Sequence, residues 1–149
     1  MNDVCRSARE AVVAAQATPD IALDLDPDCG ELTTDAERLR TVLVNLLTNA
    51  RAAVDGRDDH DGPLITIASR RHGRHVRLTV RDRGVGIAAD DIGRVFDPYF
   101  TTRRTGSGLG LAISKNVVEG LGGAIRVSSR LEVGTEITLD LTDMPERRT

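Results

Sequence analysis

The sequence predicts an α+β fold: a two-layer α/β sandwich in which about three helices cover one face of a mixed, mostly antiparallel sheet. Two segments, 35–54 and 109–121, carry apolar residues at helical spacing. Two others, 64–80 and 124–141, alternate apolar and polar residues on either side of a glycine-containing turn. Helices and antiparallel hairpins that are separated along the chain in this way favour a helical layer packed on a sheet.

The helix expected over 35–54 has the clearest pattern, because its apolar residues define one buried face. They are Leu39, Val42, Leu43, Leu46, Leu47, Ala50 and Val54. The polar stretch 55–63 is typical of an exposed loop. The hairpins pair strands 64–69 with 76–80 and 124–129 with 135–141. Residues 4–15 are expected to form a helix and residues 21–25 a short strand.

Composition indicates a single globular domain over residues 1–149, with a motif-bearing core at 35–141 and a disordered tail at 142–149. A net charge of -3 and only 2% aromatic residues argue against a nucleic-acid partner. No apolar run is long enough to span a bilayer, and the first residues do not resemble a signal peptide. We therefore expect a cytoplasmic domain without direct membrane contact, although its parent protein can be membrane-anchored.

Asn45 and Asn49 lie four residues apart, so both side chains project from the same face of the first strong helix. Two asparagines beside buried leucines need partners for their amides. They can be satisfied amides at the edge of the core, or their oxygens can ligate magnesium that is shared with substrate phosphates.

The segment Asp82-Arg83-Gly84-Val85-Gly86-Ile87 follows the strand expected to end at Val80. Its glycines allow the backbone to approach a ligand closely. Asp82 can accept a hydrogen bond from the exocyclic amine of adenine, whereas guanine has an oxygen at that position. The alternative is an ordinary turn in which Asp82 binds its own backbone.

Glycines also open the second long helix, in Gly106-Ser107-Gly108-Leu109-Gly110-Leu111. Exposed amides at a helix start attract phosphate oxygens, and a glycine inside the helix, Gly110, costs about 1 kcal/mol relative to alanine and so needs a reason. The preceding segment, 95–104, holds both phenylalanines and the only tyrosine. It can plug the core, or it can be the hinge of a lid over 97–105 that is mobile before nucleotide binds.

Taken in order, these segments resemble the catalytic ATP-binding domain of two-component sensor histidine kinases, within the superfamily that includes gyrase-type ATPases. Asn45 to Ala50 resemble its asparagine box, Asp82 to Ile87 and Gly106 to Leu111 its glycine boxes, and Phe96 to Phe100 its phenylalanine box. Gly134-Thr135 resembles the closing glycine-threonine, whose hydroxyl helps to hold adenine through water. The sequence of residues 96–102 is most similar to that of the nitrogen-regulation branch of these kinases.

The resemblance implies ATP and Mg²⁺ as ligands, with Asn49 on the metal and Asn45 supporting the metal and the phosphates. Catalytic roles are implied for Asn45, Asn49, Arg103 and Arg104; the arginines could replace a lysine that the family often has at the position of Ala52. The implied nucleotide contacts are Asn45, Asn49, Ala53, Asp82, Gly84, Gly86, Ile87, Phe96, Thr101, Thr102, Gly106, Gly108, Leu109, Gly110, Leu111 and Thr135.

The resemblance also implies a partner. ATP-hydrolysing relatives carry a glutamate where this chain has Asn45, and an amide cannot serve as a general base. None of His60, His72 and His75 has the context of a phosphate acceptor. The expected acceptor is a histidine on a separate dimerisation and phosphotransfer domain, followed by a response regulator. The alternatives are an anti-sigma-type serine/threonine kinase and a non-catalytic, nucleotide-regulated module.

Overall fold

The sheet has five strands, and the computed structural model describes residues 1–15, 20–57, 62–98, 100 and 110–143. Its strands are β1 (Ile21–Leu25), β2 (Ile65–His72), β3 (His75–Asp82), β4 (Ala124–Arg130) and β5 (Gly134–Thr142). Their spatial order is β1-β2-β3-β5-β4. Only the β1–β2 pairing is parallel, so the predicted mixed, mostly antiparallel sheet is confirmed.

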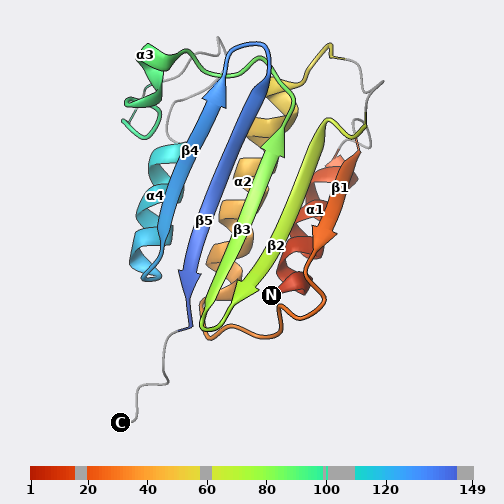
Figure 1. Cartoon of the computed structure of the whole chain (residues 1–149), viewed down its shortest axis with the longest axis vertical. Helices are drawn as coiled ribbons and strands as arrows, with labels where there is room; N and C mark the ends of the chain where they lie inside the picture. Colours follow the sequence, from red (N-terminus) through yellow and green to blue (C-terminus); the bar gives the residue numbers. More distant parts are fainter. Residues whose placement is uncertain (16–19, 58–61, 99, 101–109, 144–149) are drawn as a thin grey trace.

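Three helices cover one face of this sheet: α1 (Asn2–Ala15), α2 (Ala36–Ala53) and α4 (Gly110–Gly120). Figure 1 shows them behind the strands, with α2 across the middle of the sheet and α1 and α4 on either side of it. The described residues leave the other face of the sheet open. The predicted two-layer sandwich is therefore confirmed.

Helix α2 occupies the centre of the core because its apolar stripe is continuous. Leu39, Leu43 and Leu47 have no exposed surface, and they meet the inward side chains of β2 and β3. Asp35 caps the start of the helix by accepting a hydrogen bond from the Arg38 N–H at 3.1 Å. The sheet contributes alternate residues to the same core, as strand pleating requires.

The structure corrects the ends of β2 and β3 and the start of the predicted tail, and it adds one element. Strand β2 continues past Ser69 to His72. Strand β3 continues past Val80 to Asp82, because Arg81 points to the open face while Asp82 points inward, so the alternation continues in polar residues. A short helix, α3 (Ala89–Ile92), lies against β4 and was not predicted, since it is too short to show periodicity. In the expected tail, Thr142 ends β5 and the Asp143 side chain accepts from the Thr33 N–H at 2.8 Å; residues 144–149 lie outside the described part.

Candidate nucleotide site

A cavity of about 350 Å³ opens between α2, the adjoining ends of β3 and β5, and the start of α4. Its walls are apolar over most of their area, with a few polar groups at two ends, which is typical of a small-molecule site. The lining residues are Asn45, Leu46, Thr48, Asn49, Ala50, Ala52, Ala53, Val80, Asp82, Val85, Gly86, Ile87, Val95, Phe100, Gly110, Leu111, Thr135 and Ile137. Residues that are distant in the sequence thus line the same cavity.

Asp82 provides the buried acid of the cavity, with only 7% of its surface exposed. The Gly84 N–H donates to its Oδ1 at 2.9 Å, and the Thr135 backbone N–H donates to the same carboxylate. Burial raises the pKa of Asp82, while these two hydrogen bonds and the charge of Arg57 act in the opposite direction. The turn interpretation and the ligand interpretation of Asp82 are compatible, because one carboxylate both holds its own loop and faces the cavity.

Close backbone approaches fix this end of the site and explain its glycines. A Cβ on Gly84 would lie 2.5 Å from the Ala53 carbonyl oxygen at the end of α2. Gly86 has φ +74°, and a Cβ there would run into the carbonyl of Arg130. The Glu132 N–H donates to the Val85 carbonyl at 2.8 Å, which ties the loop to the β4–β5 turn. Gly84 itself does not line the cavity; its lack of a side chain lets the segment after β3 pack closely against the end of α2.

Asn45 joins α2 to α4 at the other end of the cavity. Its Nδ2 donates to the Gly110 carbonyl at 2.8 Å and to the Ser114 Oγ at 2.9 Å. Both amide hydrogens are thereby used, which leaves Oδ1 as an acceptor. A Cβ on Gly110 would lie 2.9 Å from that Oδ1. This contact is the reason for a glycine at the start of α4.

Asn49 and Ala53 continue the same helical stripe along the wall of the cavity, as spacing on α2 predicts. Ala52, the position at which the family resemblance leads one to expect a lysine, also lines the cavity and adds no charge to it. The group that would replace that lysine was predicted to be Arg103 or Arg104, and both lie outside the described residues. The metal and phosphate roles of the two asparagines stay predictions.

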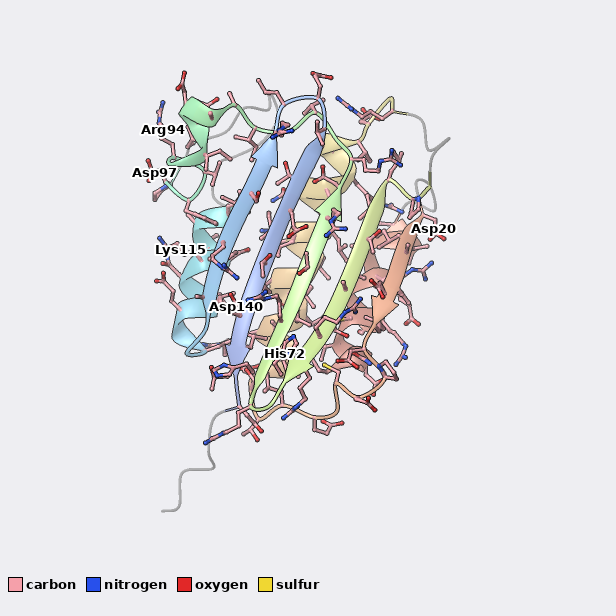
Figure 2. All side chains as sticks on the ribbon, viewed as in Figure 1. Asp20, His72, Arg94, Asp97, Lys115 and Asp140 are labelled. Carbon is pink, nitrogen blue, oxygen red and sulfur yellow. The ribbon has the colours of Figure 1, made fainter. Side chains whose placement is uncertain are left out.

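The aromatic segment divides between core and cavity. Val95 and Phe100 line the cavity, whereas Phe96 packs against the hydrophobic core and lies 5.5 Å from the Lys115 ammonium group. The Arg94 guanidinium covers the Phe100 ring at 4.6 Å. Figure 2 shows Arg94 and Asp97 beyond the end of α4, on the side of the molecule that carries Lys115.

Several predicted contact residues lie outside the described part of the chain. These are Thr101, Thr102, Gly106, Gly108 and Leu109, together with most of the lid expected over 97–105. Ile87, Gly110, Leu111 and Thr135 are described, and all four line the cavity. Sequence reasoning missed the apolar wall formed by Leu46, Val80 and Ile137; Val80 and Ile137 are register partners, a pairing that only the sheet topology reveals.

Comparison with known proteins accounts for this arrangement. The family described as histidine kinase-, DNA gyrase B- and HSP90-like ATPase matches residues 34–145. The chain belongs to this ATPase family. Its family match includes α2, the glycine segment after β3, α4 and the last hairpin, which are the elements that build the cavity. The predicted superfamily is thus confirmed.

Relatives of this ATPase domain are sensor histidine kinases. It is 42% identical over 109 residues to the sensor histidine kinase ZraS of Escherichia coli K12, covering 73% of this chain and 22% of ZraS. It is 38% identical over 145 residues to the sensor-like histidine kinase SenX3 of Mycobacterium bovis, covering 93% of this chain and 34% of SenX3. The chain therefore spans about a fifth to a third of these relatives. The nitrogen-regulation branch stays a prediction.

Solved structures show the same architecture. The nucleotide-free catalytic domain of the histidine kinase ThkA is similar with a TM-score of 0.80 and 27% identity, over 99% of this chain and 95% of that one. The full-length kinase ShkA in complex with AMPPNP is similar with a TM-score of 0.75 and 27% identity, over 93% of this chain and 29% of ShkA. The predicted fold type is confirmed.

The part of the chain that the structure describes contains no helix long and apolar enough to cross a membrane. Within the same residues, no group of three or more histidine, cysteine or acidic side chains could hold a metal ion.

Proposed function

We propose that this domain binds Mg²⁺-ATP and donates the γ-phosphoryl group to a histidine on a separate helical domain of its parent protein. The observation that carries the proposal is Asp82, a buried carboxylate that lines the same cavity as Asn45 and Asn49 of α2. An acceptor at one end and amide oxygens at the other suit a molecule with an amino-substituted base and a polyphosphate.

The polar groups at the two ends of the cavity support one orientation of the nucleotide. At the Asp82 end, apolar groups such as Val80 and Ile137 can enclose a purine ring, and the carboxylate accepts from its amine. At the α2–α4 end, Asn45 and Asn49 line the wall beside Gly110. Bound Mg²⁺ would neutralise phosphate charge there, and Asn49 is the residue we expect to hold it.

We expect no general base for water at position 45, because this position holds an amide whose two hydrogens bind Gly110 and Ser114. His72 and His75 are exposed at the β2–β3 hairpin, and His60 lies outside the described residues. The nucleophile is therefore expected from a partner. The relatives' greater length supports a histidine-bearing domain in the same parent chain, with a response regulator acting downstream.

Transfer in trans tests this proposal. The isolated domain should neither hydrolyse ATP appreciably nor label itself with γ-phosphate. Mixed with the helical, histidine-bearing domain of its parent, it should label that domain in an acid-labile form, because phosphohistidine is acid-labile. Asn49→Ala should abolish the labelling, while its circular dichroism spectrum and its melting temperature stay close to those of the wild type.

Acid-stable label on a serine or threonine would contradict the histidine assignment and support the anti-sigma-type alternative. Nucleotide binding without transfer to any histidine-bearing partner would support the non-catalytic module instead.

A further inference from the structure

Ser129 on β4 lies outside all the motifs that the family resemblance covers, yet its hydroxyl connects three parts of the base end of the cavity. The N–H of Ile87, the last residue of the glycine segment, donates to the Ser129 Oγ at 2.8 Å. The same Oγ lies 2.9 Å from the Gly134 carbonyl oxygen and 2.8 Å from the Thr135 Oγ1. Both Ile87 and Thr135 line the cavity.

Proton accounting decides the direction of these hydrogen bonds. A serine hydroxyl has one hydrogen to donate and two lone pairs that accept. The Gly134 carbonyl can only accept, so the Ser129 hydrogen goes there. The Ile87 N–H can only donate, so it takes one lone pair. The remaining lone pair faces Thr135, whose hydroxyl must therefore be the donor.

This direction sets what Thr135 offers to a ligand. Because the hydrogen of Thr135 points toward Ser129, its oxygen presents lone pairs alone to the cavity. The neighbouring Asp82 carboxylate is an acceptor when ionised, and it is held by the Gly84 and Thr135 backbone N–H groups. The two polar side chains at the base end, those of Asp82 and Thr135, thus present acceptors, and they match an amine, which can donate two hydrogens, better than a carbonyl.

We propose that Ser129 is a specificity-determining positioning residue, which orients the Thr135 hydroxyl so that the base end accepts a 6-amino purine and rejects a 6-oxo purine. It acts through Thr135 and does not itself touch the base. The inference rests on the proposed function and deepens it by naming a residue that determines base selection.

Removing the Ser129 hydroxyl should change selectivity in a defined way. In Ser129→Ala, Thr135 loses its acceptor and can turn its hydrogen into the cavity. That hydrogen can then bind the oxygen of a 6-oxo purine, which the wild type rejects. Affinity for the 6-amino base should fall while affinity for the 6-oxo base falls less or rises.

The test compares ADP with inosine diphosphate, which carry the same sugar and phosphates and differ in the base. Dissociation constants are measured by calorimetry for wild type and variants, with melting temperatures as a check on folding. We expect wild type to prefer ADP, and Ser129→Ala to reduce the preference by about tenfold, the value of one hydrogen bond. Ser129→Thr, which keeps a hydroxyl on a strand position, should restore it.

Ser128→Ala is the matched control, because Ser128 is the adjacent residue on the exposed side of β4 and should leave the ratio unchanged. An unchanged ADP preference in folded Ser129→Ala would overturn the role of Ser129 and leave the proposed function standing. Equal wild-type affinity for both nucleotides would overturn the all-acceptor arrangement. If the wild type binds neither nucleotide, the proposed function and this inference fail together.

Discussion

The two faces of the sheet hold their side chains by different means. On the covered face, Leu78 and Leu139 are register partners and are almost completely buried under α2. On the open face, charged partners such as Arg77 and Asp140 lie across strands in contact with solvent. Dense packing makes small displacements costly on the first face, whereas water can replace a lost partner on the second. Residues that need a precise position, including Asp82, accordingly lie on the covered face.

Gly134→Ala should have the largest effect, because two backbone constraints meet at this residue, where β5 begins. Its φ is +145°, and a Cβ would run into the carbonyl oxygen of Asp82. We expect the free energy of unfolding to fall by about 3 kcal/mol or more, measured by urea denaturation. Gly120→Ala is the control: nothing lies within 4 Å of its Cβ position, so that variant should be neutral or slightly more stable. If the Gly134→Ala variant is as stable as the wild type, the close approach of Gly134 to the Asp82 carbonyl is contradicted.

Asp82→Asn tests the buried acid and should come next in size. Loss of a charged acceptor should weaken ATP binding by roughly 10- to 100-fold at neutral pH, and discrimination against GTP should shrink with it. Calorimetric titration with both nucleotides measures both effects. Equal affinity of the wild type for ATP and GTP would contradict the adenine assignment.

The raised pKa of Asp82 adds a pH signature that has opposite signs for stability and for binding. Because the folded protein holds this proton more tightly than the unfolded chain, the stability that Asp82 contributes falls as pH rises from the ordinary carboxyl range through the raised pKa. ATP affinity should rise over the same window, since the amine needs the ionised carboxylate. Titrations at several pH values should show both trends in the wild type, and Asp82→Asn should lack them.

Asn45 and Gly110 should show a smaller, coupled effect at the other end of the cavity. Gly110→Ala places a Cβ against the pinned Asn45 amide and should cost about 1–2 kcal/mol. In an Asn45→Ala background the obstacle is gone, so the same change should be neutral or gain helix propensity of about 1 kcal/mol. A double-mutant cycle by denaturation measures the coupling. If the effects of the two substitutions on the free energy of unfolding simply add, the contact with Asn45 does not explain the glycine at position 110.

The sequence predicts the elements of this fold better than the contacts between them. Helix α2 and both hairpins are found because their apolar periodicity is local. The sequence did not predict that β3 extends to Asp82 with its side chain on the buried face, because a polar residue does not extend an apolar alternation. The contact of Ser129 with Ile87 joins residues 42 positions apart, and only the assembled sheet brings them together. Local patterns predict elements, whereas the site depends on distant pairs.

Asp140→Asn should have the smallest effect, because Asp140 lies on the open face, as Figure 2 shows. Partial burial raises the pKa of Asp140, but the hydrogen bonds and charges of Arg77 and Arg126 outweigh it and hold the pKa below its usual value. Its oxygens lie 2.8 Å from Arg77 Nε and 2.7 Å from Arg126 Nη2. The stabilisation is present above the ordinary carboxyl pKa and is lost as pH falls through the lowered one.

With about a third of the Asp140 side chain exposed, screening limits this stabilisation to at most about 1 kcal/mol. Urea denaturation of the wild type and of Asp140→Asn at low and at high salt measures it, and the difference between the two proteins should shrink as salt rises. Nucleotide affinity should not change, since Asp140 does not line the cavity. A loss of about 3 kcal/mol, as large as that expected of a packing defect, would mean that side chains on the open face are tightly constrained, which would break the distinction between the two faces.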